Sequence, residues 1–424
     1  MRTYTSHERE VVLRNLPQAT FVSFLAIAVV EFAVPFLAVS TLGASSATVS
    51  ALAVARFLPA LLVSEVASNY VTRHGFRRAM IAAEILRVAA FVAATAGAAL
   101  PAAAIPLFVL ALALVSIAGA LGGIGAGDAV PYLTEGPTRV RMYSRLSIAE
   151  SGADTIGPFA AGLLLAWLDA PVAFIICAVL AALAVRLFTS LPGWQVPEAA
   201  PPSSGENKKG LSVVSGLRIN LGEPTIRSVF CWMVMYNFGQ SVVMSVFLIA
   251  ITRDLGLSAA QYGVLASVVV IFAMVGAWWA GRVVSRAGWA GRLFQLAGIG
   301  TMAAYALIGS SFMAPAGVAV VLLVVFLAVE EFLSAVTGIL ISGYRASYVP
   351  DALRPGSIAS NRAVVALAVV AGYAIGGLLG LHVPAVPLMV VTGLVMLVAS
   401  VVWLAPRTVV ADVEAAHRHA EVPV

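Results

Sequence analysis

The segment SNYVTRHG, Ser68–Gly75, has a counterpart in GRVVSRAG, Gly281–Gly288. Both copies end an apolar stretch and carry a hydroxyl residue, an arginine and a glycine in the same spacing. Further matches follow in the same order: Tyr132-x-x-Glu135 with Tyr348-x-x-Asp351, and Gly157 and Gly162 with Gly372 and Gly377. Matches at nearly constant spacing indicate that the chain consists of two halves with the same plan.

About twelve apolar stretches of about 20–25 residues fill these halves, and each is long enough to cross a hydrocarbon core of about 30 Å. They lie at 18–41, 47–71, 79–99, 105–126, 144–168, 171–190, 226–251, 259–284, 292–313, 317–341, 358–381 and 384–405. Only 11% of the 424 residues are charged, against about 25% in soluble domains. The runs are continuous rather than alternating, which predicts an all-α integral membrane protein and excludes a membrane barrel.

Basic residues mark one side of the membrane. Arg253 is the one basic residue in the six loops expected outside. The opposite loops and the termini carry Arg2, Arg9, Arg14, Arg73, Arg77, Arg78, Arg139, Arg141, Lys208, Lys209, Arg218, Arg286, Arg345, Arg354, Arg407 and Arg418. The positive-inside rule therefore places both termini in the cytoplasm, and we expect a bacterial cytoplasmic (inner) membrane. The same rule accounts for the net charge of +5, so nucleic acid is not an expected partner.

The polar segments divide the chain into domains. We expect a cytoplasmic N-terminal segment (1–17), a six-helix bundle (18–190), a cytoplasmic linker (191–225), a second six-helix bundle (226–405) and a cytoplasmic tail (406–424) that is disordered. The linker is rich in Pro, Ser and Lys, which is typical of flexible connections. Its last part, 211–222, alternates apolar residues with Arg218 and Asn220, which predicts a short amphipathic helix on the inner membrane surface.

With these features the chain resembles the major facilitator superfamily over essentially its whole length. The family motif between helices 2 and 3 is G-x-x-x-D-R-x-G-R-[RK]. Its counterparts here are Thr72, Arg73, Gly75, Arg77 and Arg78, with Ser285, Arg286 and Gly288 in the second half. The resemblance implies two pseudo-symmetric six-helix bundles and a cytoplasmic gating loop at this motif. The acidic residue of the motif is absent in both copies, so Arg73 and Arg286 need other partners.

Helix 5 carries a second motif of small residues, Gly152, Gly157, Pro158 and Gly162. It resembles the G-P-x-x-G-G motif of drug/proton antiporters, with Ala161 in place of one glycine. Glycine allows close approach of helices, so packing alone also explains the pattern. Further segments resemble the macrolide-efflux and enterobactin-exporter type permeases: Ala55-Arg56-x-x-Pro59, Met80-Ile81-x-x-Glu84-x-x-Arg87, Leu217-Arg218 with Pro224 and Arg227, and Ala346–Asp351.

Charged residues at mid-membrane depth cost about 2.5–3.5 kcal/mol each on insertion scales, so each needs a reason. By position Glu31, Asp154, Glu330 and Glu331 lie near the centre, and they are our candidates for proton coupling. The resemblance implies that helices 1, 4, 7 and 10 line the cavity, which places Glu31 and one of the two adjacent glutamates there. A carboxyl group shielded from water can exchange protons near neutral pH.

Structural ion pairs are the alternative reading of these charges. Arg56 could neutralise Asp154 or Glu31, and Glu84 and Arg87 are spaced to pair on one helix. Arg56 together with Tyr236, Asn237 and Gln240 of helix 7 gives the candidates for substrate contact in the cavity. Helix packing is an equally open explanation for the helix 7 residues.

Several functional classes have no support in the sequence. Catalytic triads, phosphate-binding loops and His/Cys clusters are missing, so we expect no enzyme activity, no cofactor and no metal. We expect a monomer in the lipid bilayer that exports a small amphipathic compound, a drug or natural product, in exchange for protons or another ion. A facilitator-type importer of a small metabolite is the first alternative. A receptor or assembly factor on the same scaffold is the second.

Overall fold

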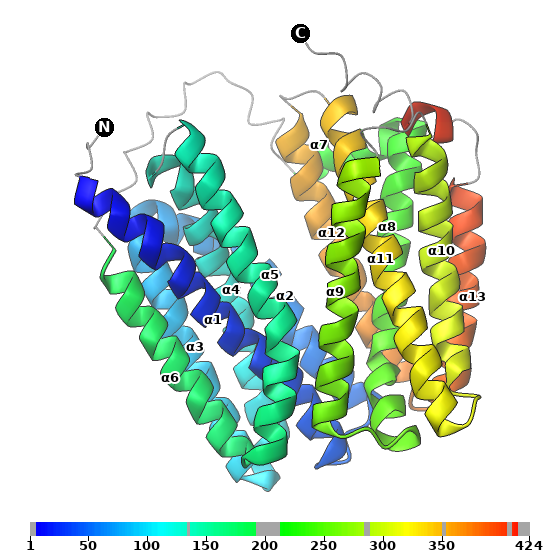
Figure 1. The fold of residues 1–424 in the computed structure, drawn as a ribbon, viewed down its shortest axis with the longest axis horizontal. Helices are drawn as coiled ribbons and strands as arrows, with labels where there is room; N and C mark the ends of the chain where they lie inside the picture. Colours follow the sequence, from blue (N-terminus) through cyan, green and yellow to red (C-terminus); the bar gives the residue numbers. More distant parts are fainter. Residues whose placement is uncertain are drawn as a thin grey trace. The chain divides into compact units, whose positions relative to one another are not determined.

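The computed structural model describes residues 6–133, 136–191, 213–283, 289–349, 353–404 and 409–413, and within them it is helical without strands (Figure 1). The long helices are α1 (Ser6–Ser40), α2 (Ser46–His74), α3 (Phe76–Ala99), α4 (Ala104–Leu133), α5 (Gly136–Trp167), α6 (Ala170–Thr189), α8 (Pro224–Ile249), α9 (Ala259–Val283), α10 (Ala290–Ser311), α11 (Ala316–Tyr348), α12 (Arg354–Leu379) and α13 (Ala385–Leu404). The all-helical membrane fold predicted from the sequence is thereby confirmed.

Among the described residues, eleven helices are long and apolar enough to cross a membrane. The remaining long helix, α5, has the length but combines Glu150 and Asp154 with several small residues, which lowers its hydropathy. Large apolar side chains stay exposed along the helices, for example Leu62 at 71% and Val402 at 65%. Hydrocarbon chains can cover such side chains, whereas water would leave them unfavourably exposed.

The chain forms two compact units. Unit 1 contains residues 1–44, 51–206 and 257–267, and unit 2 contains 45–50, 207–256 and 268–424. In unit 1, α3 packs against α4 and α6, and α1 packs against α5 and α6. In unit 2, α10 packs against α11 and α13, and α8 packs against α12 and α13. The two sets correspond helix by helix, so the repeat seen in the sequence is also a repeat of packing.

Close helix contacts in both units require glycine. A Cβ on Gly157 of α5 would lie 2.3 Å from the Cβ of Ala28 on α1. A Cβ on Gly372 of α12 would lie 2.3 Å from the backbone oxygen of Phe238 on α8. Real side chains do not approach so closely, which explains why glycine stands at both equivalent positions.

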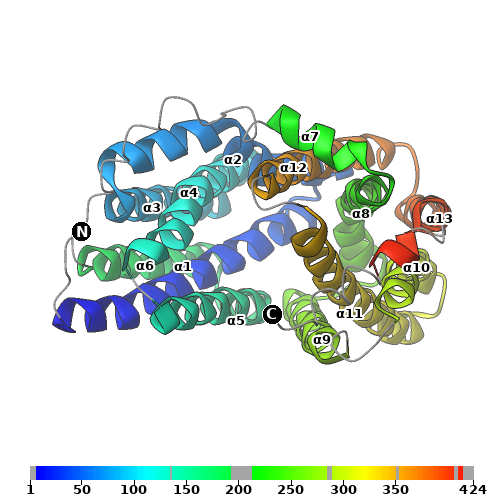
Figure 2. The same cartoon turned by 90° about the horizontal axis from the view of Figure 1, so that it is seen from above.

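The helix α7 (Val213–Gly222) lies in the predicted linker and confirms the short helix expected there. The side-chain amide of Asn220 donates from Nδ2 to the Ser360 hydroxyl at 3.0 Å, and the Ser357 hydroxyl donates to Asn220 Oδ1 at 2.6 Å. Figure 2 shows α7 beside α12, which carries both serines. The end of the linker is thus fixed to unit 2.

Two boundaries differ from the sequence expectation. The first helix begins at Ser6, well before the predicted start at 18. In the tail, residues 409–413 are helical, with Val409 and Val413 buried. The Thr225 hydroxyl donates to the Asp412 carboxylate at 2.5 Å. The expectation of a disordered tail is therefore wrong for 409–413, because two valines bury there and an aspartate finds a donor on α8.

Candidate coupling and substrate site

Unit 2 holds a buried carboxyl group among hydroxyl groups. Glu330 of α11 is only 2% exposed. The Tyr236 hydroxyl of α8 lies 2.9 Å from its Oε1 and 3.0 Å from the Ser334 hydroxyl. In the part of the chain that the structure describes, no basic side chain lies within salt-bridge distance of Glu330. The carboxyl group is therefore held by neutral donors alone.

Aromatic rings extend this cluster. Trp232 stacks on Tyr236 with ring centroids 5.5 Å apart, and its indole donates to the Ser400 hydroxyl at 2.8 Å. Tyr305 of α10 meets Tyr236 edge-on at 6.1 Å. The Tyr305 hydroxyl is buried beside Tyr236 and Glu330, and it makes no hydrogen bond of standard geometry with a described residue. The arrangement thus combines packed aromatic rings with hydroxyl groups around one carboxyl group.

The other predicted residues of this region lie on the same helices. Glu331 is half-buried, whereas its neighbour Glu330 is buried, as expected for adjacent positions on a helix. The Asn237 amide donates to the Met233 carbonyl oxygen of its own helix at 2.8 Å, and Gln240 is half-buried. Ser334 and Tyr305 were not predicted. Ser334 stands one turn after Glu330, a spacing that could have revealed it.

In unit 1, the carboxyl group of Glu31 is paired with an arginine. Arg56 of α2 donates to Glu31 of α1 at 2.5 Å. The side chain of Arg56 is 40% exposed and that of Glu31 is 19% exposed. The structure thus resolves one alternative left open by the sequence, because Arg56 pairs with Glu31. Asp154 of α5 is exposed and lies within electrostatic range of the same guanidinium.

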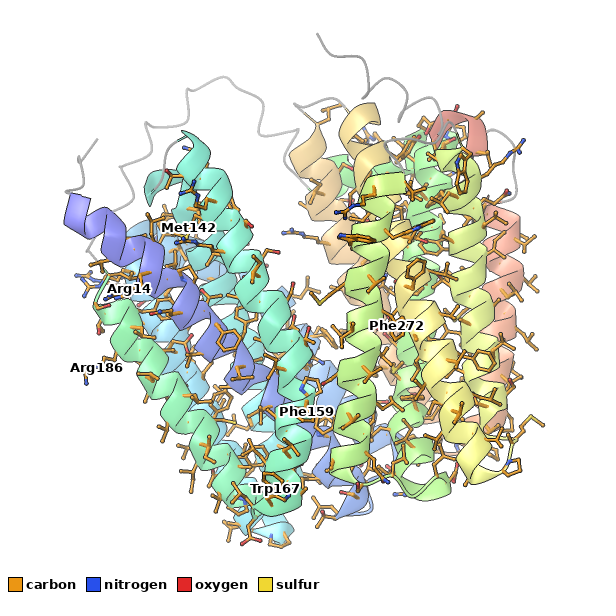
Figure 3. The ribbon with its side chains drawn as sticks, viewed as in Figure 1. Arg14, Met142, Phe159, Trp167, Arg186 and Phe272 are labelled. Carbon is orange, nitrogen blue, oxygen red and sulfur yellow. The ribbon has the colours of Figure 1, made fainter. Side chains whose placement is uncertain are left out.

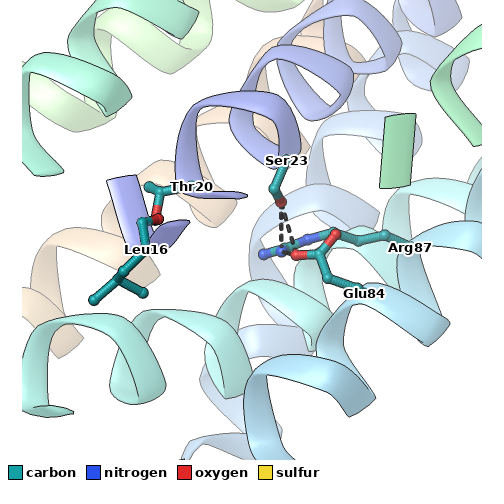
Figure 4. Close-up of polar contacts among 5 residues, drawn as sticks. All are labelled: Leu16, Thr20, Ser23, Glu84 and Arg87. Atoms are coloured by element: carbon teal, nitrogen blue, oxygen red, sulfur yellow. Dashed lines mark hydrogen bonds and ion pairs between the residues drawn. The ribbon is translucent and has the colours of Figure 1, made fainter. Parts of the chain in front are cut away.

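A second carboxyl group of unit 1 is part of a buried triad (Figure 4). The Ser23 hydroxyl of α1 donates to Glu84 Oε1 at 2.8 Å and accepts from Arg87 Nη1 at 2.7 Å. Arg87 also donates to the same Glu84 oxygen. The Glu84 and Arg87 side chains are 0% and 5% exposed. The predicted pair on helix 3 is present, and the structure adds Ser23, a long-range partner that spacing along one helix does not reveal.

Sequence comparison identifies the family that fits this architecture. The model of the Major Facilitator Superfamily matches residues 19–329. The chain belongs to the Major Facilitator Superfamily. It is accordingly a multi-pass membrane transporter. No curated protein matches it by sequence.

Solved structures of superfamily transporters share the fold. The nucleoside transporter NupG is 13% identical, with a TM-score of 0.70 over 93% of this chain and 98% of NupG. A bacterial homologue of the iron transporter ferroportin is 11% identical, with a TM-score of 0.73 over 95% and 100%. The xylose transporter XylE from E. coli is 16% identical, with a TM-score of 0.65 over 93% and 95%. At these identities the likeness extends to the fold alone.

The superfamily motif between helices 2 and 3 is mostly helical here. α2 ends at His74, Gly75 has a φ of 82°, and α3 begins at Phe76. Only glycine adopts such a φ readily, so Gly75 allows the abrupt turn between the two helices. Arg77 donates to the backbone oxygen of Thr189 at the end of α6.

The other motif residues lie beside this turn. The Thr72 hydroxyl donates to the Ser68 backbone oxygen at 2.9 Å, while Arg73 and Arg78 are exposed. In the second copy, Ser285, Arg286 and Gly288 lie outside the described residues. The gating role of either copy stays a prediction.

The glycines of the antiporter-like motif line contacts of α5 within unit 1. Gly157 faces Ala28, as described above. A Cβ on Gly162 would lie 2.7 Å from the backbone oxygen of Ala259, in the first turn of α9. Gly152 has more room, with Phe21 at 3.7 Å, and Pro158 lies inside α5 without ending it. The motif thus has a packing role here, and its link with antiport stays a prediction.

Proposed function

We propose that this superfamily member is a proton-coupled exporter of a small amphipathic compound, and that Glu330 is the group that carries the proton. The observation that supports this is the setting of Glu330, a buried carboxyl group with hydroxyl donors and no described basic partner. Charging such a group inside the protein costs free energy unless something compensates the charge. A proton can do so, and so can a cationic or polar substrate.

We place the exchange of proton and substrate at the cluster of hydroxyl groups around Glu330. Tyr236 and Ser334 are half-buried, and their hydroxyl groups continue the hydrogen-bonded cluster that begins at Glu330. The half-buried Tyr236 ring lies beside it, backed by the buried Trp232 ring. In the proposed cycle, substrate binds against Tyr236 and releases the proton of Glu330. Reprotonation on the other side releases the substrate, and rocking of the two halves alternates access.

Glu31 is the weaker coupling candidate because Arg56 already compensates its charge. Asp154 lies within electrostatic range of the same guanidinium, so part of its charge is also compensated. Glu331 is half-buried beside Glu330 and is the natural second acceptor. Arg56, Asn237 and Gln240 remain candidates for substrate contact.

Direction and orientation are further parts of the proposal. The antiporter-like glycines of α5 and the resemblance to efflux-type permeases support export. The distribution of arginines supports cytoplasmic termini and an inner-membrane location. A similar fold occurs in a D-xylose–proton symporter, 16% identical with a TM-score of 0.65, which supports proton coupling but leaves uptake as the alternative. Active alkaline phosphatase fused after residue 424 would overturn the orientation, because that enzyme matures outside the cytoplasm.

The decisive experiment follows proton movement in energised inverted vesicles while lipophilic cations and neutral drugs are added. The wild type should release protons on addition of a substrate. Glu330→Gln should abolish that release, while Glu65→Gln, a change at an exposed glutamate of α2, should not. Loss in Glu31→Gln with an intact response in Glu330→Gln would move the coupling site to unit 1.

The alternatives give different results in the same vesicles. A facilitator would show substrate counterflow that does not depend on the proton gradient. A receptor or assembly factor would show no counterflow of any solute. Substrate-driven protons moving in the same direction as the substrate would indicate symport.

A further inference from the structure

Unit 1 carries an apolar groove on its flank, apart from the polar clusters described above. It lies among α1, α5 and α6 and has a volume of about 630 Å³. Its walls are formed by Phe21 and Val22 of α1, Ile148 of α5, and Leu183 and Leu187 of α6. Ile148 and Leu183 are 69% and 44% exposed. The volume lies within the range of about 300–1,000 Å³ that is typical of ligand sites.

Small residues of α5 line one wall of the groove. Ala149 and Gly152 stand one turn apart on the face of α5 that lines it. A Cβ on Gly152 would find Phe21 at 3.7 Å, an ordinary contact distance, so close helix packing does not demand glycine here. Figure 1 shows α1 between α5 and α6, which is where the groove lies.

One end of the groove is basic. Arg145 lines it, and its guanidinium donates to the Leu13 backbone oxygen at 3.1 Å, which holds the side chain over α1. A guanidinium has five N–H donors, so donors remain for an anion. Arg14 and Arg186 are exposed on α1 and α6 at the same flank (Figure 3). None of the described residues that line the groove is acidic.

An apolar groove with arginines at one end matches one membrane component in particular. Acyl chains fill apolar grooves between helices, and basic pockets at the cytoplasmic side of membrane proteins bind anionic head groups. The groove residues come from the first part of α1, the first part of α5 and the last part of α6, so they share the end of unit 1 at which the arginines gather. A zwitterionic lipid would satisfy the apolar walls but not the net positive charge.

We propose that this groove binds an anionic phospholipid, with an acyl chain against Phe21, Ile148 and Leu183 and the phosphate at Arg145. Arg14 and Arg186 flank the head group. The site is independent of the coupling cluster in unit 2, and its existence does not depend on the transport mechanism. It connects the three helices α1, α5 and α6, two of which carry Glu31 and Asp154.

Native mass spectrometry of the purified, delipidated protein tests the proposal. Phosphatidylglycerol and phosphatidylcholine with identical acyl chains are titrated separately. The wild type should retain one phosphatidylglycerol with higher affinity than phosphatidylcholine. Arg145→Gln should lower the phosphatidylglycerol affinity about five-fold, the effect of one basic residue at a membrane surface. Ile148→Trp should weaken both lipids, because the larger side chain at this exposed position fills the groove.

Arg227→Gln is the matched control, since Arg227 is an exposed arginine on α8 of unit 2. This variant should leave the affinity for the first bound phosphatidylglycerol unchanged. Equal losses in Arg145→Gln and Arg227→Gln would mean diffuse attraction and overturn the site. Equal affinity of the wild type for both lipids would overturn head-group recognition. Gly152→Ala narrows the groove without a clash, so it replaces Ile148→Trp if that variant does not elute as a single species.

Discussion

The two units handle carboxyl groups within their helices in opposite ways. Unit 1 pairs the half-buried Glu31 with Arg56 and the buried Glu84 with Arg87. Unit 2 holds Glu330 with the hydroxyl groups of Tyr236 and Ser334, without a described basic partner. A carboxylate that is paired within the fold can stay charged through the whole cycle. One that is held by hydroxyl groups depends on a proton or a ligand for compensation. The contrast therefore supports the proposal that Glu330 is the coupling acid and that the paired acids are structural.

The largest effect is expected for the triad of unit 1. Arg87→Met leaves Glu84 buried without its cation and should lower the free energy of unfolding by about 3–5 kcal/mol. Unfolding of the purified protein in detergent micelles measures this loss. The double variant Glu84→Gln/Arg87→Met should regain most of it, because the buried charge is then absent. If single and double variants lose equal stability, packing rather than charge explains the effect.

A smaller effect is expected for the hydroxyl group that holds Glu330. Tyr236→Phe deprives Glu330 and Ser334 of a hydrogen-bond partner and should cost about 1–3 kcal/mol of unfolding free energy. Tyr305→Phe is the comparison variant, since its buried hydroxyl lies beside Glu330 and Tyr236 without a hydrogen bond of standard geometry to a described residue. Removing that hydroxyl should cost less than removing the Tyr236 hydroxyl. Equal losses in the two variants, in the same unfolding assay, would show that the Tyr236 bond contributes nothing specific.

The contrast between the two units depends largely on contacts between helices, which cannot be predicted from the sequence. The match of Gly157 with Gly372 predicted equivalent positions, and both glycines lie in equivalent close contacts. Such positions are predictable because the same helix contact excludes a side chain in both halves. The place of Glu330 near the middle of α11 followed from counting along an apolar run. These features depend on local sequence and on the repeat.

Partners between helices were not predictable in the same way. Arg56 of α2 reaches Glu31 of α1, a pairing between two helices for which the sequence left Asp154 equally possible. Tyr305 meets Tyr236 from α10, far away along the chain. Ser23 joins the triad from α1. In each case the packing of helices, rather than spacing along one helix, brings the groups together.

The partly exposed Arg56–Glu31 pair of unit 1 should contribute less to the free energy of unfolding than the buried triad. Arg56 and Glu31 are partly accessible, so their attraction is screened, and a coupling free energy of about 0.2–1 kcal/mol is expected. A double-mutant cycle with Arg56→Gln and Glu31→Gln measures it. The coupling should shrink at high salt. A coupling free energy well above this range that does not change with salt would indicate that the Arg56–Glu31 pair is shielded from solvent. The pair would then resemble the buried Glu84–Arg87 pair.

The smallest effect on stability is expected at Glu330 itself. Glu330→Gln preserves the size of the side chain and an oxygen acceptor for Tyr236, so the unfolding free energy should change by less than about 1 kcal/mol, the net value of one hydrogen bond. The same variant should lose proton movement driven by substrate. A variant that stays stable but no longer moves protons would indicate that Glu330 acts in transport rather than in folding. A large loss of stability would instead indicate that the charged form of Glu330 supports the fold, as the paired acids do in unit 1. The contrast between the two units would then disappear.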